Sequence, residues 1–152
     1  MPLAHIHPMI VHFPIVLALL ALAFDLWWLI FRRGAETPLI RLRTGTVIMT
    51  LGALSAIVAA TFGDMAYDIA ISKGVAESML ETHQGLGVTT MIVFIVAALL
   101  RLFLWWRQMD QKPAGIAIAI LASAVVVVLV IVTAYFGGVL VYDHGVNVGP
   151  MS

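Results

Sequence analysis

Four long apolar runs constrain the fold of this chain more than any other feature. They cover residues 8–31, 44–63, 85–106 and 114–141. Each run is long enough to cross a hydrocarbon core of ~30 Å as a helix. Because 62% of the residues are hydrophobic and only 11% are charged, little sequence remains for a soluble domain. The sequence predicts an all-α, integral membrane bundle of four transmembrane helices that forms one domain over residues 1–152.

The basic residues predict how this bundle is oriented in the bilayer. Lysine and arginine concentrate in cytoplasmic loops, and seven of the eight basic residues lie beside the first or the third connection, with Lys73 as the exception. The tryptophans at 27, 28, 105 and 106 fall at the same membrane face, where amphipathic rings prefer to lie. Both termini and the second connection are therefore expected on the outer side. A net charge of zero makes nucleic acid an implausible partner, so the lipid bilayer is the expected one.

Two ionisable residues, Asp25 and Arg101, fall inside the apolar runs at similar calculated depth. An unpaired charge inside the membrane is costly, so we expect them to neutralise each other. The second run places small residues along one side, which predicts a close helix-packing face: Gly45, Gly52, Ala56, Ala59 and Gly63. Residues 64–81 mix apolar and acidic side chains, and a short helix on the membrane surface is one reading of them. Thr82 and Pro113 are expected to begin the third and fourth spans.

All histidines of the chain lie at the ends of the apolar runs that face the outer side. They are His5, His7, His12, His83 and His144. Imidazole can ligate a transition metal, ligate haem iron or carry protons. Five such residues at one face of a chain with few charged side chains predict a binding site. The absence of cysteine excludes thiolate metal sites, iron–sulfur clusters and covalent haem attachment within the chain.

Three segments together resemble the bacterial four-helix membrane proteins of domain of unknown function 2231. The segments are the opening residues 7–15 (HPMIVHFPI), the residues 83–85 (HQG) and the closing residues 137–148 (GGVLVYDHGVNV). Asn147 departs from the glycine expected there in the closing motif. The resemblance implies a multi-pass protein of the bacterial cytoplasmic membrane, with its outer side in the periplasm. It also implies electron transfer alongside Rieske or c-type cytochrome partners.

A b-type haem requires two axial nitrogens from facing helices and a flat slot between helices. His12 and His83 are the first choice for the axial ligands, and Gly85, Gly137 and Gly138 are expected to leave room for the macrocycle. Straight helices would place His12 about seven residues, or ~10 Å, deeper than His83. If the kink expected at Pro14 does not absorb this difference, His7 becomes the better partner of His83. The sequence therefore predicts haem b in an electron-transfer or anchoring subunit of a respiratory assembly.

Two alternatives remain open at this stage. In the first, His5, His7, His12, His83 and His144 supply ligands for copper, iron or zinc without a porphyrin, with nearby aspartates and methionines completing the coordination sphere. In the second, the protein is a structural anchor that carries no prosthetic group. The chain carries no motif that identifies a catalysed reaction.

Overall fold

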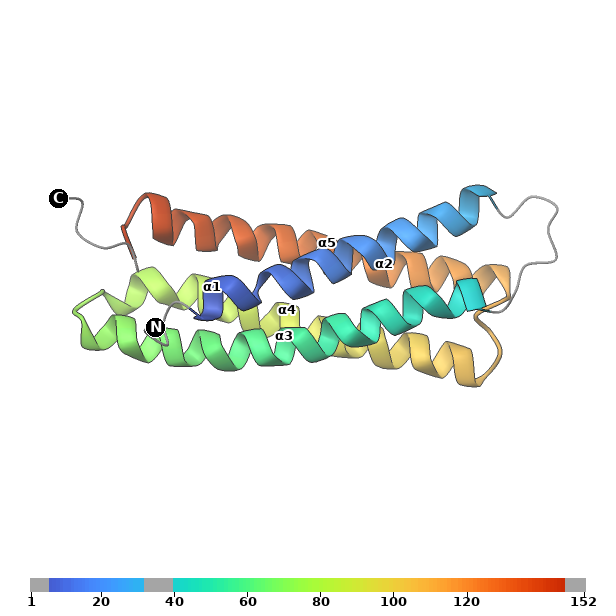
Figure 1. Ribbon diagram of the computed structural model, residues 1–152, viewed down its shortest axis with the longest axis horizontal. Helices are drawn as coiled ribbons and strands as arrows, with labels where there is room; N and C mark the ends of the chain where they lie inside the picture. The colour runs from blue at the N-terminus through green and yellow to red at the C-terminus, as the bar shows by residue number, and fades with distance from the viewer. Residues whose placement is uncertain (1–5, 32–39, 147–152) are drawn as a thin grey trace.

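The structure is a bundle of long antiparallel helices. The computed structural model describes residues 6–31 and 40–146. The helices are α1 (Ile6–Ile10), α2 (His12–Phe31), α3 (Ile40–Ser72), α4 (Glu77–Trp106) and α5 (Pro113–Tyr142) (Figure 1). Counting α1 and α2 as one span, four helical segments are long and apolar enough to cross a membrane. The predicted all-α, four-span architecture is confirmed, and the described residues contain no strand.

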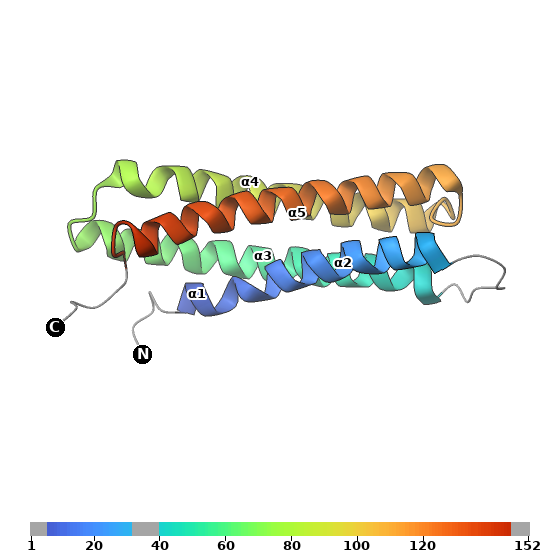
Figure 2. The same cartoon turned by 90° about the horizontal axis from the view of Figure 1, so that it is seen from above.

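The long helices pack in a ring in which each contacts two neighbours. α2 packs against α3 and α5, and α4 packs against the same two helices. α2 and α4 are therefore diagonal across the bundle and run in the same direction, as do α3 and α5 (Figures 1 and 2). The start of α1, the α3–α4 connection and the end of α5 lie at one end of the bundle (Figure 1). We call this end the histidine end, and it corresponds to the predicted outer face.

The second connection is much shorter than the apolar runs suggested. α3 continues to Ser72 and α4 begins at Glu77, so residues 64–81 form no separate surface helix. Hydropathy marks the part of a helix that suits a bilayer, whereas the helix itself ends where backbone hydrogen bonding fails. Here Gly74, just beyond the end of α3, has a left-handed φ of +86° and ends the helix. The α4 N-cap is Ala76 and not Thr82, whereas Pro113 does occupy the first turn of α5 as predicted.

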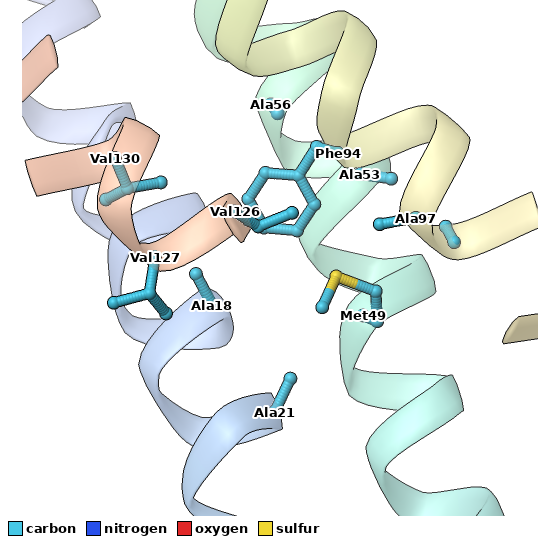
Figure 3. Close-up of a cluster of buried hydrophobic side chains, with 11 residues drawn as sticks. Ala18, Ala21, Met49, Ala53, Ala56, Phe94, Ala97, Val126, Val127 and Val130 are labelled. Atoms are coloured by element: carbon cyan, nitrogen blue, oxygen red, sulfur yellow. The ribbon is translucent and has the colours of Figure 1, made fainter. Parts of the chain in front are cut away.

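The protein core is built around Phe94, which reaches from α4 toward the three other long helices (Figure 3). Small residues on α3 allow this close approach. A Cβ added to Gly52 would lie 2.5 Å from Cε1 of Phe94, so the ring occupies the space a side chain would need. The predicted packing face of α3 is thus used for packing, with Ala53, Ala56 and Ala59 also buried. Large apolar side chains point outward instead, for example Leu99 and Leu121, which are 60% and 65% exposed. This is the pattern expected of a lipid-facing surface.

Asp25 and Arg101 form the predicted ion pair at the other end of the bundle. Nη1 and Nη2 of Arg101 donate to the two carboxylate oxygens of Asp25 at 2.6 and 2.8 Å. The hydroxyl of Ser123 on α5 donates to the same carboxylate at 2.7 Å. Arg101 is only 2% exposed, and Gly45 leaves no room for a Cβ beside its guanidinium. The pair joins the diagonal helices α2 and α4 through the centre of the bundle.

Candidate cofactor site

A large apolar cavity occupies the histidine end of the bundle. Its volume is about 530 Å³, and α1 and all four long helices contribute to its walls. This size lies within the ~300–1,000 Å³ typical of small-molecule and cofactor sites. Most of the lining is aliphatic or glycine, and two histidines, His7 and His83, project into it from opposite sides of the bundle.

The rings of His7 and His83 lie next to each other in the cavity, in a T-shaped arrangement. Their centroids are 6.3 Å apart and their planes meet at 76°. His7 reaches this position because α1 is a separate short helix that packs against α3. His83 lies two turns into α4, on the diagonal helix. Both rings are partly buried, and they approach each other although they come from the first and the third span of the sequence.

Each of the two rings is held in the same way by a backbone carbonyl. Nδ1 of His7 lies 2.9 Å from the carbonyl oxygen of Ala59, and Nδ1 of His83 lies 3.1 Å from that of Thr133. A carbonyl oxygen can only accept, so Nδ1 must carry the hydrogen in both rings. In the neutral form of each ring, the lone pair is therefore on Nε2. This is the tautomer in which a histidine ligates a metal ion through Nε2 while a carbonyl orients the ring.

A glycine one turn after each carbonyl makes room for the ring. A Cβ on Gly63 would lie 3.1 Å from Cε1 of His7, and a Cβ on Gly137 would lie 2.9 Å from Cε1 of His83. A side chain at either position would require the neighbouring imidazole to shift from the place it occupies beside its carbonyl. Gly63 therefore lies beside His7 as well as on the packing face of α3, and Gly137 lines the cavity beside His83.

The structure separates the remaining predicted site residues. His12 lines the edge of the cavity but its side chain is exposed. His144 is exposed beyond the end of α5 and does not line the cavity. Gly138 does line it, whereas Gly85 is on the exposed side of α4 and the cavity is lined by Gly87 instead. His5 lies outside the described residues.

Sequence reasoning missed several polar groups of the site. The hydroxyls of Thr90 and Thr133 are 2.8 Å apart at the cavity wall, which ties α4 to α5 beside His83. Thr90 follows His83 by seven residues, a spacing that returns to the same helix face. Tyr67, on the outer part of α3, also lines the cavity, as does Lys73, whose charge at this face was evident from the sequence.

The described residues do not form a conventional metal site. They contain no group of three or more His, Cys, Asp or Glu side chains that could hold a metal ion. A site for copper, iron or zinc without a porphyrin normally requires at least three protein ligands. His7 and His83 provide two, which is the number that a bis-histidine haem requires.

Comparison with known proteins places the chain in a family. The family model described as a predicted membrane protein, DUF2231, matches residues 4–150. The chain belongs to this family. The resemblance noted from the DUF2231 motifs is thereby confirmed over nearly the whole chain. No curated protein and no solved structure matches it.

Proposed function

We propose that this protein binds haem b in the cavity at the histidine end, with His7 and His83 as the axial ligands, and that it transfers electrons within a respiratory assembly. The observation that carries the proposal is the arrangement of the two rings. Two imidazoles that bind one iron from opposite sides at ~2.0 Å would place their centroids about 6.3 Å apart, because Nε2 lies ~1.15 Å from its ring centroid. The observed separation is 6.3 Å.

The surroundings of the two rings also suit a haem. Both Nδ1 atoms are bonded to carbonyl oxygens, so both Nε2 atoms are available to iron without any change of tautomer. The apolar walls would receive the macrocycle, and the polar groups at the outer edge of the cavity, Lys73 and Tyr67, would receive its propionates. When bound, the haem would supply a one-electron redox centre, while the chain holds its ligands and keeps bulk water away.

His7 is the better partner of His83 because it already faces that ring, whereas the side chain of His12 is exposed. The site for a metal ion without porphyrin has weaker support, since only two histidines converge among the described residues. If the protein were a structural anchor, a water molecule bridging the two rings would permit a similar separation. This anchor reading predicts a colourless protein.

The family resemblance supports the wider setting of the proposal. We place the protein in the bacterial cytoplasmic membrane with the histidine end facing the periplasm. A haem at that end would exchange electrons with periplasmic or membrane-bound partners of the Rieske or c-type cytochrome classes. The four-span bundle would meanwhile anchor such an assembly in the bilayer.

A reduced-minus-oxidised visible spectrum of the purified full chain tests the proposal. Haem-replete cells should give a red protein with a sharp α band near ~560 nm, as expected for low-spin bis-histidine iron. His7→Ala and His83→Ala should each abolish the band. His12→Ala and His144→Ala are the matched controls, and both should retain it. A colourless, iron-free wild-type protein would refute haem binding. Loss of the band in His12→Ala would instead indicate that His12 and His83 are the axial ligands.

A further inference from the structure

Residues of the first span recur in the third span at a constant interval. The interval from Asp25 to Arg101 is 76 residues, and the interval from His7 to His83 is the same. Among the described side chains, the buried positions of the first span recur as buried positions in the third at this interval. These are Pro14 with Thr90, Ala18 with Phe94, and Ala21 with Ala97. The two spans therefore present the same face to the bundle interior, although their side chains differ.

The second and fourth spans repeat in the same way, at a slightly shorter interval. The carbonyls that hold the histidines belong to Ala59 and Thr133. The two glycines beneath the rings, Gly63 and Gly137, have the same spacing as these carbonyls. The two intervals differ slightly because the α2–α3 connection and the α4–α5 connection differ in length. Such connections can vary in length without disturbing the packing.

The packing of the bundle has the arrangement that a two-fold axis along its length would produce. Such an axis exchanges α2 with α4 and α3 with α5, which are the diagonal pairs that run in the same direction (Figures 1 and 2). The wall of the cavity follows the same rule. All six residues between positions 7 and 15 that line the cavity have an equivalent in the third span, at the His7-to-His83 interval, that also lines it.

Side chains near such an axis meet their own equivalents. His7 therefore faces His83, and Asp25 faces Arg101. Two identical aspartates or two identical arginines would repel each other inside the membrane, so the equivalent positions must differ in charge to form a stable pair. Two histidines can remain identical because both can ligate one ion.

We infer that the chain consists of two tandem helical hairpins related by this axis, and that haem binds in two orientations that differ by a half-turn about it. The inference rests on the proposed function. Its physical basis is that the two faces of the macrocycle would meet equivalent histidines, carbonyls and glycines. Natural haem is not symmetrical about the line that runs through the iron and between its two propionates. Each orientation therefore brings different substituents against a given wall. The difference in binding free energy between the orientations is then set by unequal wall residues such as Val11 and Gly87.

Proton NMR of the oxidised, haem-loaded full chain tests the inference through the paramagnetically shifted haem methyl signals. Two sets of methyl signals are expected with protohaem IX. The protein can also be reconstituted with a synthetic haem that is symmetrical about the line between its two propionates. The two orientations are then identical, so a single set of methyl signals is expected. A single set with protohaem IX, in a protein that shows the α band, would overturn the two-orientation inference and leave haem binding intact. Absence of the α band would overturn the proposed function and this inference with it.

A matched pair of glycine variants gives a second measurement. A Cβ at Gly87 meets no atom within 4 Å, and Gly87 lines the cavity, so Gly87→Val changes one wall of the cavity. It makes that wall resemble its equivalent at Val11 and should change the ratio of the two methyl sets by more than about twofold. Gly85→Val adds the same side chain outside the cavity, where there is also no atom within 4 Å, and should leave the ratio unchanged. Equal effects of the two variants would contradict the assignment of the wall.

Discussion

Neutralising Asp25 is expected to destabilise the protein strongly, because it leaves Arg101 charged in the centre of the bundle. The guanidinium is 2% exposed and donates two hydrogen bonds to the Asp25 carboxylate. Its remaining acceptors are the hydroxyl of Ser123 and the carbonyl of Ala119, neither of which carries a charge. Removing one member of a buried pair typically costs ~3–5 kcal/mol. These two neutral acceptors place Asp25→Asn near the lower end of that range, at about 3 kcal/mol.

The reverse change should cost a similar amount for the same reason. In Arg101→Gln, the Asp25 carboxylate keeps only the hydroxyl of Ser123, at 2.7 Å. The double variant buries two neutral amides that can hydrogen-bond to each other, so its loss should be smaller than the sum of the two single losses. A coupling free energy of about 2 kcal/mol between the two positions is expected from this arrangement.

Equilibrium unfolding in mixed detergent micelles, with helix content as the signal, measures these free energies. Asp143→Asn is the matched control because Asp143 is exposed beyond α5, and its effect should stay within ~0.5 kcal/mol. If the losses of the two single variants simply add in the double variant, the direct contact between α2 and α4 is refuted.

Two further changes test the packing and the orientation. Gly52→Ala places a Cβ 2.5 Å from Cε1 of Phe94, and this overpacking should lower the free energy of unfolding by ~1–3 kcal/mol in the same assay. Val96→Ala, at an exposed position on α4, is its control, and an equal loss there would show that the core contact is unimportant. A reporter that is active only after export, fused after Ser152, should be active because both basic connections stay in the cytoplasm. Activity of a cytoplasmic reporter at that position instead would reverse the proposed orientation.

The spans and the ion pair could be predicted from the sequence because both depend on simple helix geometry. A rise of about 1.5 Å per residue, counted from the ends of the apolar runs, was enough to place Asp25 and Arg101 at one depth. The helix ends near Gly74 could not be placed in this way. Hydropathy falls where a helix leaves the bilayer, but α3 and α4 both continue beyond that point. The glycine itself was the available signal for the turn.

The choice between His7 and His12 needed the helix face as well as the depth. Counting depth from the inner end favoured His7, which lies closer to the depth of His83 than His12 does, but the break between α1 and α2 could not be read from an apolar run. The side of the helix on which each residue lies distinguishes the two histidines. His7, Pro14, Ala18 and Asp25 recur at intervals that stay on one side of a helix, and His12 lies off this side.

The same reasoning connects the two ends of the bundle. His7 precedes Asp25 by eighteen residues, and His83 precedes Arg101 by eighteen residues, which is five helical turns or ~27 Å. Because the ion pair joins α2 to α4 at one end, it sets both the rotation and the height of one helix relative to the other. The two histidines then meet at the opposite end, although their helices are diagonal and each packs mainly against α3 and α5. The intramembrane charges are therefore best understood as the element that aligns the two hairpins, and the facing histidines as the result of that alignment.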